Sequence, residues 1–273
     1  MSDYEAFGRM ERESWSDASR TSRYAELFAP AADQAIKALL DAVGAKNGDR
    51  ALDICCGQGN VSEALIARGC EVSGLDFSPP MLQMARQRVP GARFVEADAQ
   101  DLPFQDSHFD IVVSNLGICH VPDQCRALSE AYRVLRLGGQ FAMTVWCGPD
   151  VSRSFELLYA AIEAHGSPDL GIPSGPDFHQ FAKIDIASRV LSKIGFSSVN
   201  LTVVDCSWEL ERPESLCEIF EKATVRAAML LANQPPERLS AIRSAVANAV
   251  RERFGNGGRW RVPMPAALIS ARK

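Results

Sequence analysis

The first half of the chain alternates between short apolar runs and amphipathic stretches. Apolar, strand-like runs occur at 50–55, 71–75, 93–95, 109–114 and 141–147, and helical patterns lie between them at 61–68, 81–88 and 124–135. Glycine or proline-glycine ends each helical pattern, as expected for helix C-termini. Strands that alternate with helices predict an α/β fold with a doubly wound, mostly parallel sheet. The near-continuous apolar character of the strands predicts helices on both faces of that sheet.

The pattern differs on either side of this region, which suggests three segments. Residues 1–30 are polar with scattered aromatic side chains and are expected to form an N-terminal arm or lid. Residues 31–147 are expected to form the ligand-binding α/β core, beginning with a helix near 32–43. Residues 148–273 would complete the sheet with strands 199–210 and 259–271, around helices at 155–164, 186–194, 213–232 and 236–254.

The helical pieces in 148–182 and 213–254 interrupt the strand rhythm and are expected to form a cap. In open α/β folds, ligands bind outside the carboxyl edge of the sheet. We therefore expect the cap to cover that edge and to contact a substrate.

Composition and charge narrow the class of protein. The 273 residues are 47% hydrophobic and carry a net charge of −5, which favours a globular chain and disfavours nucleic acid as a partner. No apolar run is long enough to span a bilayer, and the N-terminus lacks the pattern of a secretion signal, so a cytoplasmic location is expected. The eight cysteines show no C-x-x-C spacing, which predicts free thiols and no metal site.

A glycine-containing turn follows the first strand. Asp53 lies on the strand, and Gly57 and Gly59 form a Gly-x-Gly turn before the next helix. Such a turn lets the backbone approach a ligand closely, and a dinucleotide site is one interpretation. Two features disfavour it: Asp53 would repel a pyrophosphate, and Ser62 occupies the place of the third glycine. A carboxylate there suits a positively charged group such as an α-ammonium.

Two further acids lie at the ends of the next strands. Asp76 ends the second strand, where a carboxylate can accept both hydrogen bonds of a ribose diol, and Asp98 follows the third. Each acid alone could simply cap a turn. Together with the glycine turn, the three acids describe a pocket for an amino acid joined to adenosine without phosphates.

Residues 50–147 resemble the class I S-adenosylmethionine (SAM) dependent methyltransferases, in particular the methyltransferase-11 group of small-molecule enzymes that includes quinone C-methyltransferases. The segments that carry the resemblance are LDICCGQG (52–59), GLDFSPPML (74–82), ADA (97–99), LPF (102–104), FDIVVSN (109–115) and RVLRLGG (133–139). Cys55 departs from the glycine usual in the family and narrows the loop, and Leu137 replaces a proline. The resemblance implies a Rossmann-like sheet of seven strands whose last strand is antiparallel.

The resemblance also implies a cofactor, SAM, which becomes S-adenosylhomocysteine after methyl transfer. Asp53, Gly57 and Gly59 would hold its methionine part. Asp76 would bind the ribose hydroxyls.

The remaining cofactor contacts are implied in the same way. Phe77 and Met81 would flank the adenine, and Asp98 and Ala99 would meet its edge. Asn115 would line the floor of the site near the sulfonium.

His120 is the candidate general base, because it lies in the loop after the fourth strand, beside the expected methyl group. The alternative is that His120 only packs or binds backbone there. Tyr24, in the arm, could close over the cofactor or pack on the first helix. His165 and His179, in the irregular cap segment, are weaker candidates, and His108 is expected to be exposed.

The expected function is transfer of a methyl group to a small, hydrophobic or aromatic metabolite. The loop after the fourth strand lacks the Asn/Asp-Pro-Pro-aromatic turn of enzymes that methylate nucleobases or glutamine amides. Two alternatives remain: a SAM-binding protein of this fold without methyl transfer, and an NAD-dependent oxidoreductase.

Overall fold

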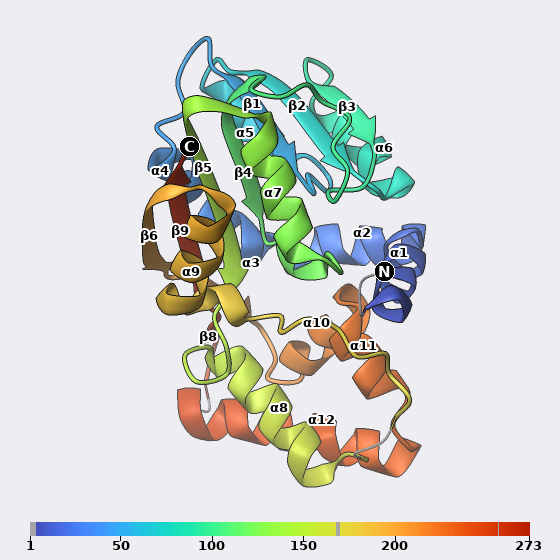
Figure 1. Ribbon diagram of the computed structural model, residues 1–273. Coiled ribbons are helices and arrows are strands. Elements are labelled where there is room, and N and C mark those ends of the chain that lie inside the picture. Colours follow the sequence, from blue (N-terminus) through green and yellow to red (C-terminus); the bar gives the residue numbers. More distant parts are fainter. Residues whose placement is uncertain (1–3, 168–169, 256) are drawn as a thin grey trace.

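A computed structural model of the chain describes residues 4–167, 170–255 and 257–273. Its central sheet has seven strands in the order β3-β2-β1-β4-β5-β9-β6 (Figure 1). The strands are β1 (Arg50–Ile54), β2 (Glu71–Asp76), β3 (Arg93–Glu96), β4 (Phe109–Asn115), β5 (Leu135–Trp146), β6 (Ser197–Val204) and β9 (Ala266–Arg272). Neighbouring strands are parallel except at β9, which is antiparallel to both β5 and β6. The doubly wound fold and its antiparallel last strand are confirmed.

Helices cover both faces of the sheet. On one face, α4 (Ile36–Ala42) and α5 (Asn60–Ala67) bury leucines and valines against the strands. On the other, α7 (Gln124–Val134) and α9 (Ile184–Ile194) do the same. The fifth core helix, α6 (Pro79–Arg88), packs beside β2 and β3 and begins as the sequence predicts, with the Ser78 side chain accepting a hydrogen bond from the Met81 amide.

The two long strands expected after residue 195 are each divided. The first becomes β6 and β7 (Ser207–Leu210), and the second becomes β8 (Trp260–Pro263) and β9. β7 and β8 leave the main sheet together and pair with each other. The break falls at Pro263 and Pro265, which lack the N–H that a continuous ladder requires.

The N-terminal segment is more ordered than an arm of scattered aromatics would suggest. It forms α1 (Glu5–Trp15), α2 (Ala18–Arg23), a π-helical turn (Tyr24–Phe28), α3 (Ala29–Ala32) and a 3₁₀ turn (Asp33–Ala35). Phe7, Met10, Trp15 and Phe28 are all buried. The helix expected over 32–43 is thereby divided at the 3₁₀ turn. The described part of this segment is therefore a helical layer that contributes to the core, and whether it moves as a lid stays a prediction.

The cap consists of α8 (Arg153–His165), α10 (Ser215–Ala223), α11 (Arg226–Ala232) and α12 (Pro236–Phe254). The single helix expected over 213–232 is divided at Thr224, which has an extended backbone. The Thr224 hydroxyl donates to the Phe220 carbonyl at 2.6 Å and accepts from the Ala228 amide, so it satisfies the backbone groups on both sides of the break.

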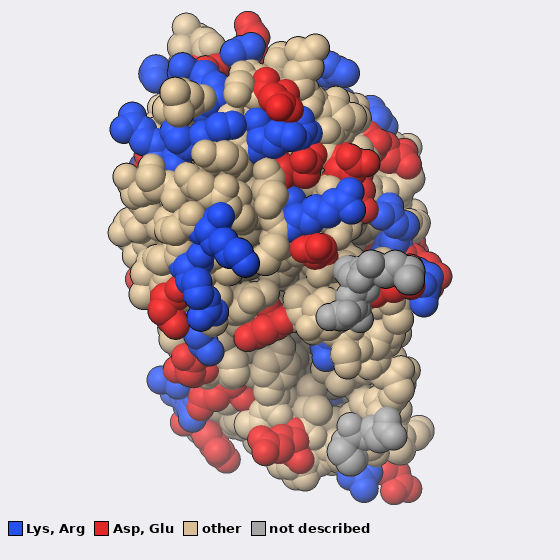
Figure 2. Space-filling model, viewed as in Figure 1, with Lys and Arg blue, Asp and Glu red and all other residues tan. Residues whose placement is uncertain are grey.

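The N-terminal helices and the cap helices lie beyond one edge of the sheet, the edge at which the carboxyl ends of β1, β4 and β5 lie (Figure 1). Residues 1–3 of the expected arm and 168–169 of the expected cap segment lie outside the described residues. On the face shown in Figure 2, basic and acidic side chains are interspersed rather than gathered by sign. Among the described residues, no helix is long and apolar enough to cross a membrane.

Candidate active site

The turn after β1 has the left-handed backbone that a glycine-rich loop predicts. Gly57 and Gly59 have φ angles of 52° and 85°, and Cys55 also lies in this region with φ 57°. A side chain at Gly59 would approach the Ala85 backbone to 3.2 Å, so this glycine also lets α5 pack on α6. Cys55 is strained, because a residue with a side chain rarely adopts this conformation. A glycine at this position would adopt the same conformation without this strain.

Asp53 is buried just before this turn. Its exposed fraction is 1%, and burial, followed by the nearby charge of Asp76, raises its pKa to about 7. Ser62, which stands where a dinucleotide motif has glycine, donates to Asp53 Oδ2 at 2.7 Å. The other oxygen, Oδ1, is buried without a hydrogen-bond partner among the described residues.

Two amide oxygens next to Asp53 are unpartnered in the same way. Gln58 Oε1 and Asn60 Oδ1 are buried and have no donor among the described residues. The Asn60 amide nitrogen binds both oxygens of Asp33 at 2.7 Å, so its oxygen faces the other way. Asp53, Gln58 and Asn60 line one cavity, together with Asp33 and Tyr24. Three unpartnered acceptors in one cavity fit a ligand group with several N–H donors, such as an ammonium.

Asp76, at the end of β2, is held in place by the backbone. Its Oδ2 accepts from the Gly57 amide and its Oδ1 from the Ser78 amide, both at 2.9 Å. Burial raises its pKa, while these backbone hydrogen bonds oppose that effect. Phe77 and Met81 follow Asp76, and all three side chains line one small cavity.

Asp98 lies in the loop after β3 and already has partners. Its Oδ2 binds Arg12 of α1 at 3.1 Å, and its Oδ1 accepts from the Gln100 backbone at 2.9 Å. The Arg12 guanidinium also lies 5.0 Å from the centre of the Phe77 ring. Asp98 and Ala99 line a cavity with Asp76 and Phe77, and α1 forms its outer wall.

Asn115, at the end of β4, joins three parts of the molecule. Its Oδ1 accepts from the Thr144 hydroxyl of β5 at 2.5 Å, and its Nδ2 donates to the Ala32 carbonyl at 3.2 Å. The side chain lines two of the cavities. Its position is therefore fixed by β5 on one side and by α3 on the other.

The three small cavities form a continuous groove along the carboxyl edge. The cavity at Asp53 shares Tyr24, Cys55, Gly57 and Asn115 with the middle cavity. The middle cavity shares Cys55, Asp76, Phe77, His120 and Val121 with the cavity at Asp98. The predicted binding residues are thus brought together along one groove, with the exception of Gly59, which lines none of these three cavities.

His120 lies where the groove meets a larger cavity, and its ring is fixed by α1. Its Nδ1 is 2.8 Å from Glu11 Oε2, and the same carboxylate accepts from Trp15 Nε1 at 2.9 Å. The Trp15 ring is edge-on to the His120 ring at 5.4 Å. Glu11 is only 2% exposed, so the carboxylate depends on these two donors. Because Nδ1 is engaged, Nε2 is the nitrogen left for a ligand.

The charge state of His120 follows from these neighbours. Burial lowers its pKa, but Cys119 and the Glu11 carboxylate outweigh burial and raise the pKa well above its usual value. A carboxylate bound to Nδ1 stabilises the protonated ring. The protonated ring of His120 is therefore stabilised. The ring can accept a proton from a substrate only at a pH high enough for it to be neutral.

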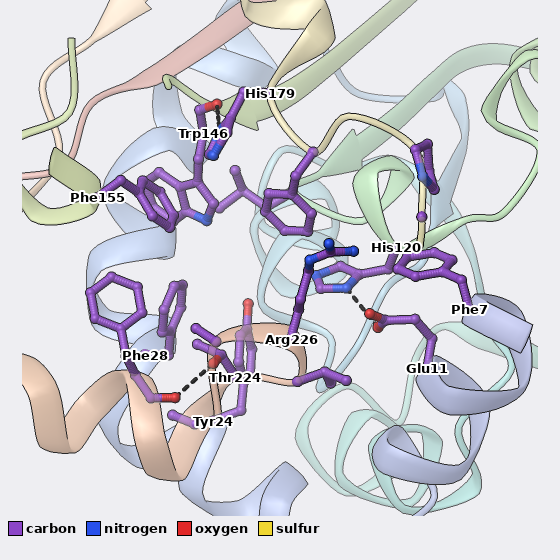
Figure 3. Close-up of a pocket in the computed structure, with 18 of the residues that line it drawn as sticks. Phe7, Glu11, Tyr24, Phe28, His120, Trp146, Phe155, His179, Thr224 and Arg226 are labelled. Atoms are coloured by element: carbon purple, nitrogen blue, oxygen red, sulfur yellow. Dashed lines mark hydrogen bonds and ion pairs between the residues drawn. The ribbon is translucent and has the colours of Figure 1, made fainter. Parts of the chain in front are cut away.

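The larger cavity has a volume of about 290 Å³ and is mainly aromatic (Figure 3). Its aromatic walls come from the N-terminal helices (Phe7, Trp15, Tyr24, Phe28), from β5 (Trp146) and from the cap (Phe155, Tyr159, Phe178, Phe220). Trp15, Tyr24, Leu116 and His120 line both this cavity and the middle part of the groove. A molecule in the cavity would therefore reach the groove at His120.

His179 also lines the large cavity. Its Nδ1 is 3.0 Å from the Trp146 carbonyl, so Nδ1 carries the hydrogen and Nε2 is an unprotonated acceptor. Burial lowers the pKa of His179, which keeps the ring neutral. His179 does not line the groove cavities, whereas His120 does.

Four residues of the N-terminal helices and the cap line these cavities without having been predicted as site residues. Glu11, Trp15 and Arg226 line the large cavity, and Asp33 lines the groove. Glu11 and Trp15 are four residues apart, and this spacing was a local signal that both lie on the same face of a helix. No local signal joins Glu11 to His120, because 109 residues separate them. Their contact exists only in the folded chain.

Comparison with known proteins adds the family. Residues 52–143 match the family of methyltransferase domains. The chain is similar to a demethylmenaquinone methyltransferase of Clavibacter sepedonicus, with 39% identity over 127 residues, which cover 44% of this chain and 52% of that protein. The chain thus spans about half the length of the curated relatives it matches.

Solved structures share the fold over a larger part of the chain. The YcgJ protein of Bacillus subtilis is 19% identical with a TM-score of 0.58, covering 88% of this chain and 97% of that one. The phosphoethanolamine N-methyltransferase 2 of Haemonchus contortus, in complex with S-adenosyl-L-methionine, is 19% identical with a TM-score of 0.60, covering 98% and 60%. Residues 52–143 are therefore similar to the methyltransferase domain family, and the chain shares the fold of a solved SAM-bound methyltransferase.

Proposed function

We propose that this protein is a methyltransferase that binds SAM in the groove and transfers its methyl group to a small aromatic or hydrophobic molecule in the large cavity. The observation that carries the proposal is the continuity of the two sites. A polar groove with three acids meets an aromatic cavity at His120. That is the arrangement that a reaction between a charged cofactor and an apolar acceptor requires.

The groove residues fit the parts of SAM in order. Asp53, with the unpartnered oxygens of Gln58 and Asn60, would receive the α-ammonium, and the Gly57 backbone would pass close to the methionine part. Asp76 would accept the ribose hydroxyls, since its carboxylate is already oriented by two amides.

The adenine end uses the outer part of the groove. Phe77 and Met81 would flank the ring, and Ala99 would meet its edge. Asp98 would accept from the adenine amino group beside its contact with Arg12. Asn115 would line the floor near the sulfonium.

When bound, SAM supplies a methyl group on a positively charged sulfur, which is already an activated electrophile. The protein's part is to hold the acceptor in line and to exclude water. The aromatic walls of the cavity would hold the acceptor, because flat side chains restrict the orientation of a planar molecule. Their apolar surface would exclude water. Tyr24, whose hydroxyl points into the cavity in Figure 3, lies between the cavity and the groove.

His120 is the proposed base for an acceptor that arrives protonated, such as a phenol. It lines both the cavity and the groove, and Glu11 holds Nδ1 so that Nε2 is free to take the proton. Glu11 also stabilises the imidazolium that forms, as the acid of a catalytic triad does. Glu11 is therefore a positioning residue for His120.

The alternatives are less well supported. An NAD-dependent oxidoreductase would place a pyrophosphate against Asp53 and two further acceptor oxygens, which would repel it. A SAM-binding protein without methyl transfer would not need an aromatic cavity next to the sulfonium. A cytoplasmic location is part of the proposal, and the free state of all eight cysteines supports a reducing compartment.

Titration calorimetry with SAM, S-adenosylhomocysteine and NAD in parallel tests this proposal. We expect both adenosyl ligands to bind and NAD to give no heat above dilution. Methyl transfer to phenols, quinols and amines would then be screened with radiolabelled SAM. Binding of NAD alone would overturn the cofactor assignment, and binding of SAM without transfer to any acceptor would favour the non-transferring alternative.

A further inference from the structure

Arg226 brings a positive charge into the aromatic cavity. It is the first residue of α11, and its guanidinium points into the cavity from the cap side in Figure 3. It is partly buried, so its charge is only partly hydrated. A cation in such a place is costly unless an anion or hydrogen-bond acceptors surround it.

The protein itself provides Arg226 with little compensation. Within the described ranges, its hydrogen bond is to the Pro173 carbonyl at 3.4 Å, which is long compared with the usual 2.9–3.0 Å. A guanidinium has five N–H donors. None of the described carboxylates forms an ion pair with it, although most other arginines in the cap are paired, for example Arg243 with Glu221 and Arg251 with Glu214.

The two acids that line the same cavity are otherwise engaged. Glu11 accepts from His120 and Trp15. Asp177 is exposed, and its Oδ1 accepts from the His179 backbone at 2.9 Å. Donors of Arg226 therefore remain available to a ligand in the cavity.

Arg226 lines the cavity but none of the three cavities of the groove. Its charge would therefore bind an acceptor rather than the cofactor. His120, in contrast, lines both sites. An acceptor that spans the cavity would place one end at Arg226 and present another to the groove.

We propose that the methyl acceptor is an aromatic carboxylic acid whose carboxylate is bound by Arg226. This inference rests on the proposed function, because it names the class of that acceptor. The walls select a planar aromatic ring, and the guanidinium matches a carboxylate through two parallel hydrogen bonds. A phosphate is a poorer match, because it carries up to two charges and, when His120 is neutral and able to act as the base, Arg226 is the one cation among the described residues that line the cavity.

Paired aromatic probes test the proposal directly. Benzoate and 2-naphthoate would each be titrated into the full chain against the matching amides, benzamide and 2-naphthamide, with and without saturating S-adenosylhomocysteine. Each pair has the same ring and nearly the same size, so the difference reports the charge. We expect the acids to bind at least about tenfold more tightly than the amides, as for a charge-assisted hydrogen bond.

Substitutions then locate the effect. Arg226→Met should abolish the preference for the acids, and Arg226→Lys should retain part of it because the charge remains. Arg238→Met is the matched control. Arg238 also lies in the cap, and its hydrogen-bond partners among the described residues are the backbone carbonyls of His165 and Gly166, but it does not line the cavity. Unchanged affinity for S-adenosylhomocysteine and an unchanged melting temperature would show that each variant is folded.

The outcomes separate this inference from the function on which it rests. Amides that bind as well as the acids, or an acid preference that survives Arg226→Met, would overturn the role of Arg226 while leaving SAM binding intact. Failure of S-adenosylhomocysteine to bind would overturn the proposed function instead. Methylation of a hydroxy- or amino-substituted benzoate, with KM raised and kcat little changed in Arg226→Met, would support both.

Discussion

At the scale of single residues, Asp53 combines a cost in stability with a proposed role in binding. Its carboxyl is buried beside Asp76, and its pKa is raised to about 7. In the unfolded chain an aspartate loses its proton near pH 4. Between these two values the folded protein holds a proton that the unfolded chain has lost, so stability falls as the pH rises from about 4 to about 7.

Asp53→Asn should therefore stabilise the protein while it removes SAM binding. The amide oxygen can still accept from Ser62, and no charge needs to be buried. We expect the free energy of unfolding at pH 8 to rise by on the order of 4 kcal/mol, with almost no gain at pH 4. Urea denaturation at both pH values measures this. The control is Asp49→Asn. Asp49 directly precedes β1 and is paired with Lys46, so its substitution should give no such gain. A gain independent of pH would contradict the explanation.

Cys55 and Gly117 form a second test at this scale. An added side-chain carbon at Gly117 would lie 2.3 Å from Cys55 Cβ, although Gly117 itself has an ordinary backbone conformation. Gly117→Ala should therefore destabilise the protein by about 1–3 kcal/mol, since it overpacks the loop. Cys55→Gly removes the obstructing atoms and relieves the left-handed strain.

The double variant should recover most of the loss, giving a coupling free energy of about 1 kcal/mol or more in a double-mutant cycle. Gly91→Ala, where nothing lies within 4 Å of the added carbon, should cost little in either background. Purely additive effects of the two substitutions would show that the loop relaxes independently of their contact.

At the scale of elements, α1 provides the residue that orients the candidate base. Glu11→Gln keeps the size of the side chain but removes the carboxylate that holds His120 Nδ1. We expect kcat to fall by about tenfold or more, with little change in KM for SAM. Because the carboxylate raises the pKa of His120, the midpoint of the rising limb of kcat against pH should move to lower pH in the variant.

The exposed neighbour Glu13 is the control on the same helix. Glu13→Gln should leave both the rate and the pH profile unchanged. A loss of rate in Glu11→Gln without movement of the pH limb would mean that Glu11 only stabilises α1 and does not act through His120.

The elements also show which features a sequence can predict. The parallel sheet and the acids Asp53 and Asp76 follow from local patterns, since the end of a strand and its loop are adjacent in the chain. Asn115 also lies at the end of a strand, but its place in the site was implied by the family resemblance. The packing of α1 was missed because Phe7, Met10 and Trp15 are separated by charged residues, so the segment is polar on average although one face is buried.

Contacts between distant segments account for the rest. Glu11 reaches His120, and Arg226 reaches the cavity, only through the packing of the N-terminal helices and the cap on the sheet. The division of the last strand into β8 and β9 had a local signal in Pro263 and Pro265. The pairing of β7 with β8, in contrast, depends on how both strands leave the sheet.

At the scale of the whole molecule, α1 covers the groove that the sheet edge forms. Gly8, Glu11 and Arg12 line its adenine end, and the Trp15 carbonyl accepts a hydrogen bond of 2.5 Å from Ser78 at the start of α6. S-adenosylhomocysteine should therefore slow amide hydrogen exchange in 7–15 as well as in 55–59 and 76–81.

Mass spectrometry of exchanged peptides measures this effect. Peptides from 241–250 of α12, which lie in the cap away from the groove, should show no change. Protection confined to the loops of the sheet edge, with α1 unaffected, would show that α1 does not close over the cofactor.

The β7–β8 ribbon has a consequence for how this fold can diverge. Leu210 and Trp260 are partners in the ribbon, so residues 211–259, which include α10, α11 and α12, leave and return at adjacent positions. Topologically this segment is one long hairpin loop. Such an insertion can be exchanged by recombination without altering the order of the seven strands, so the acceptor preference of a descendant could change in a single genetic step while its cofactor groove is inherited intact.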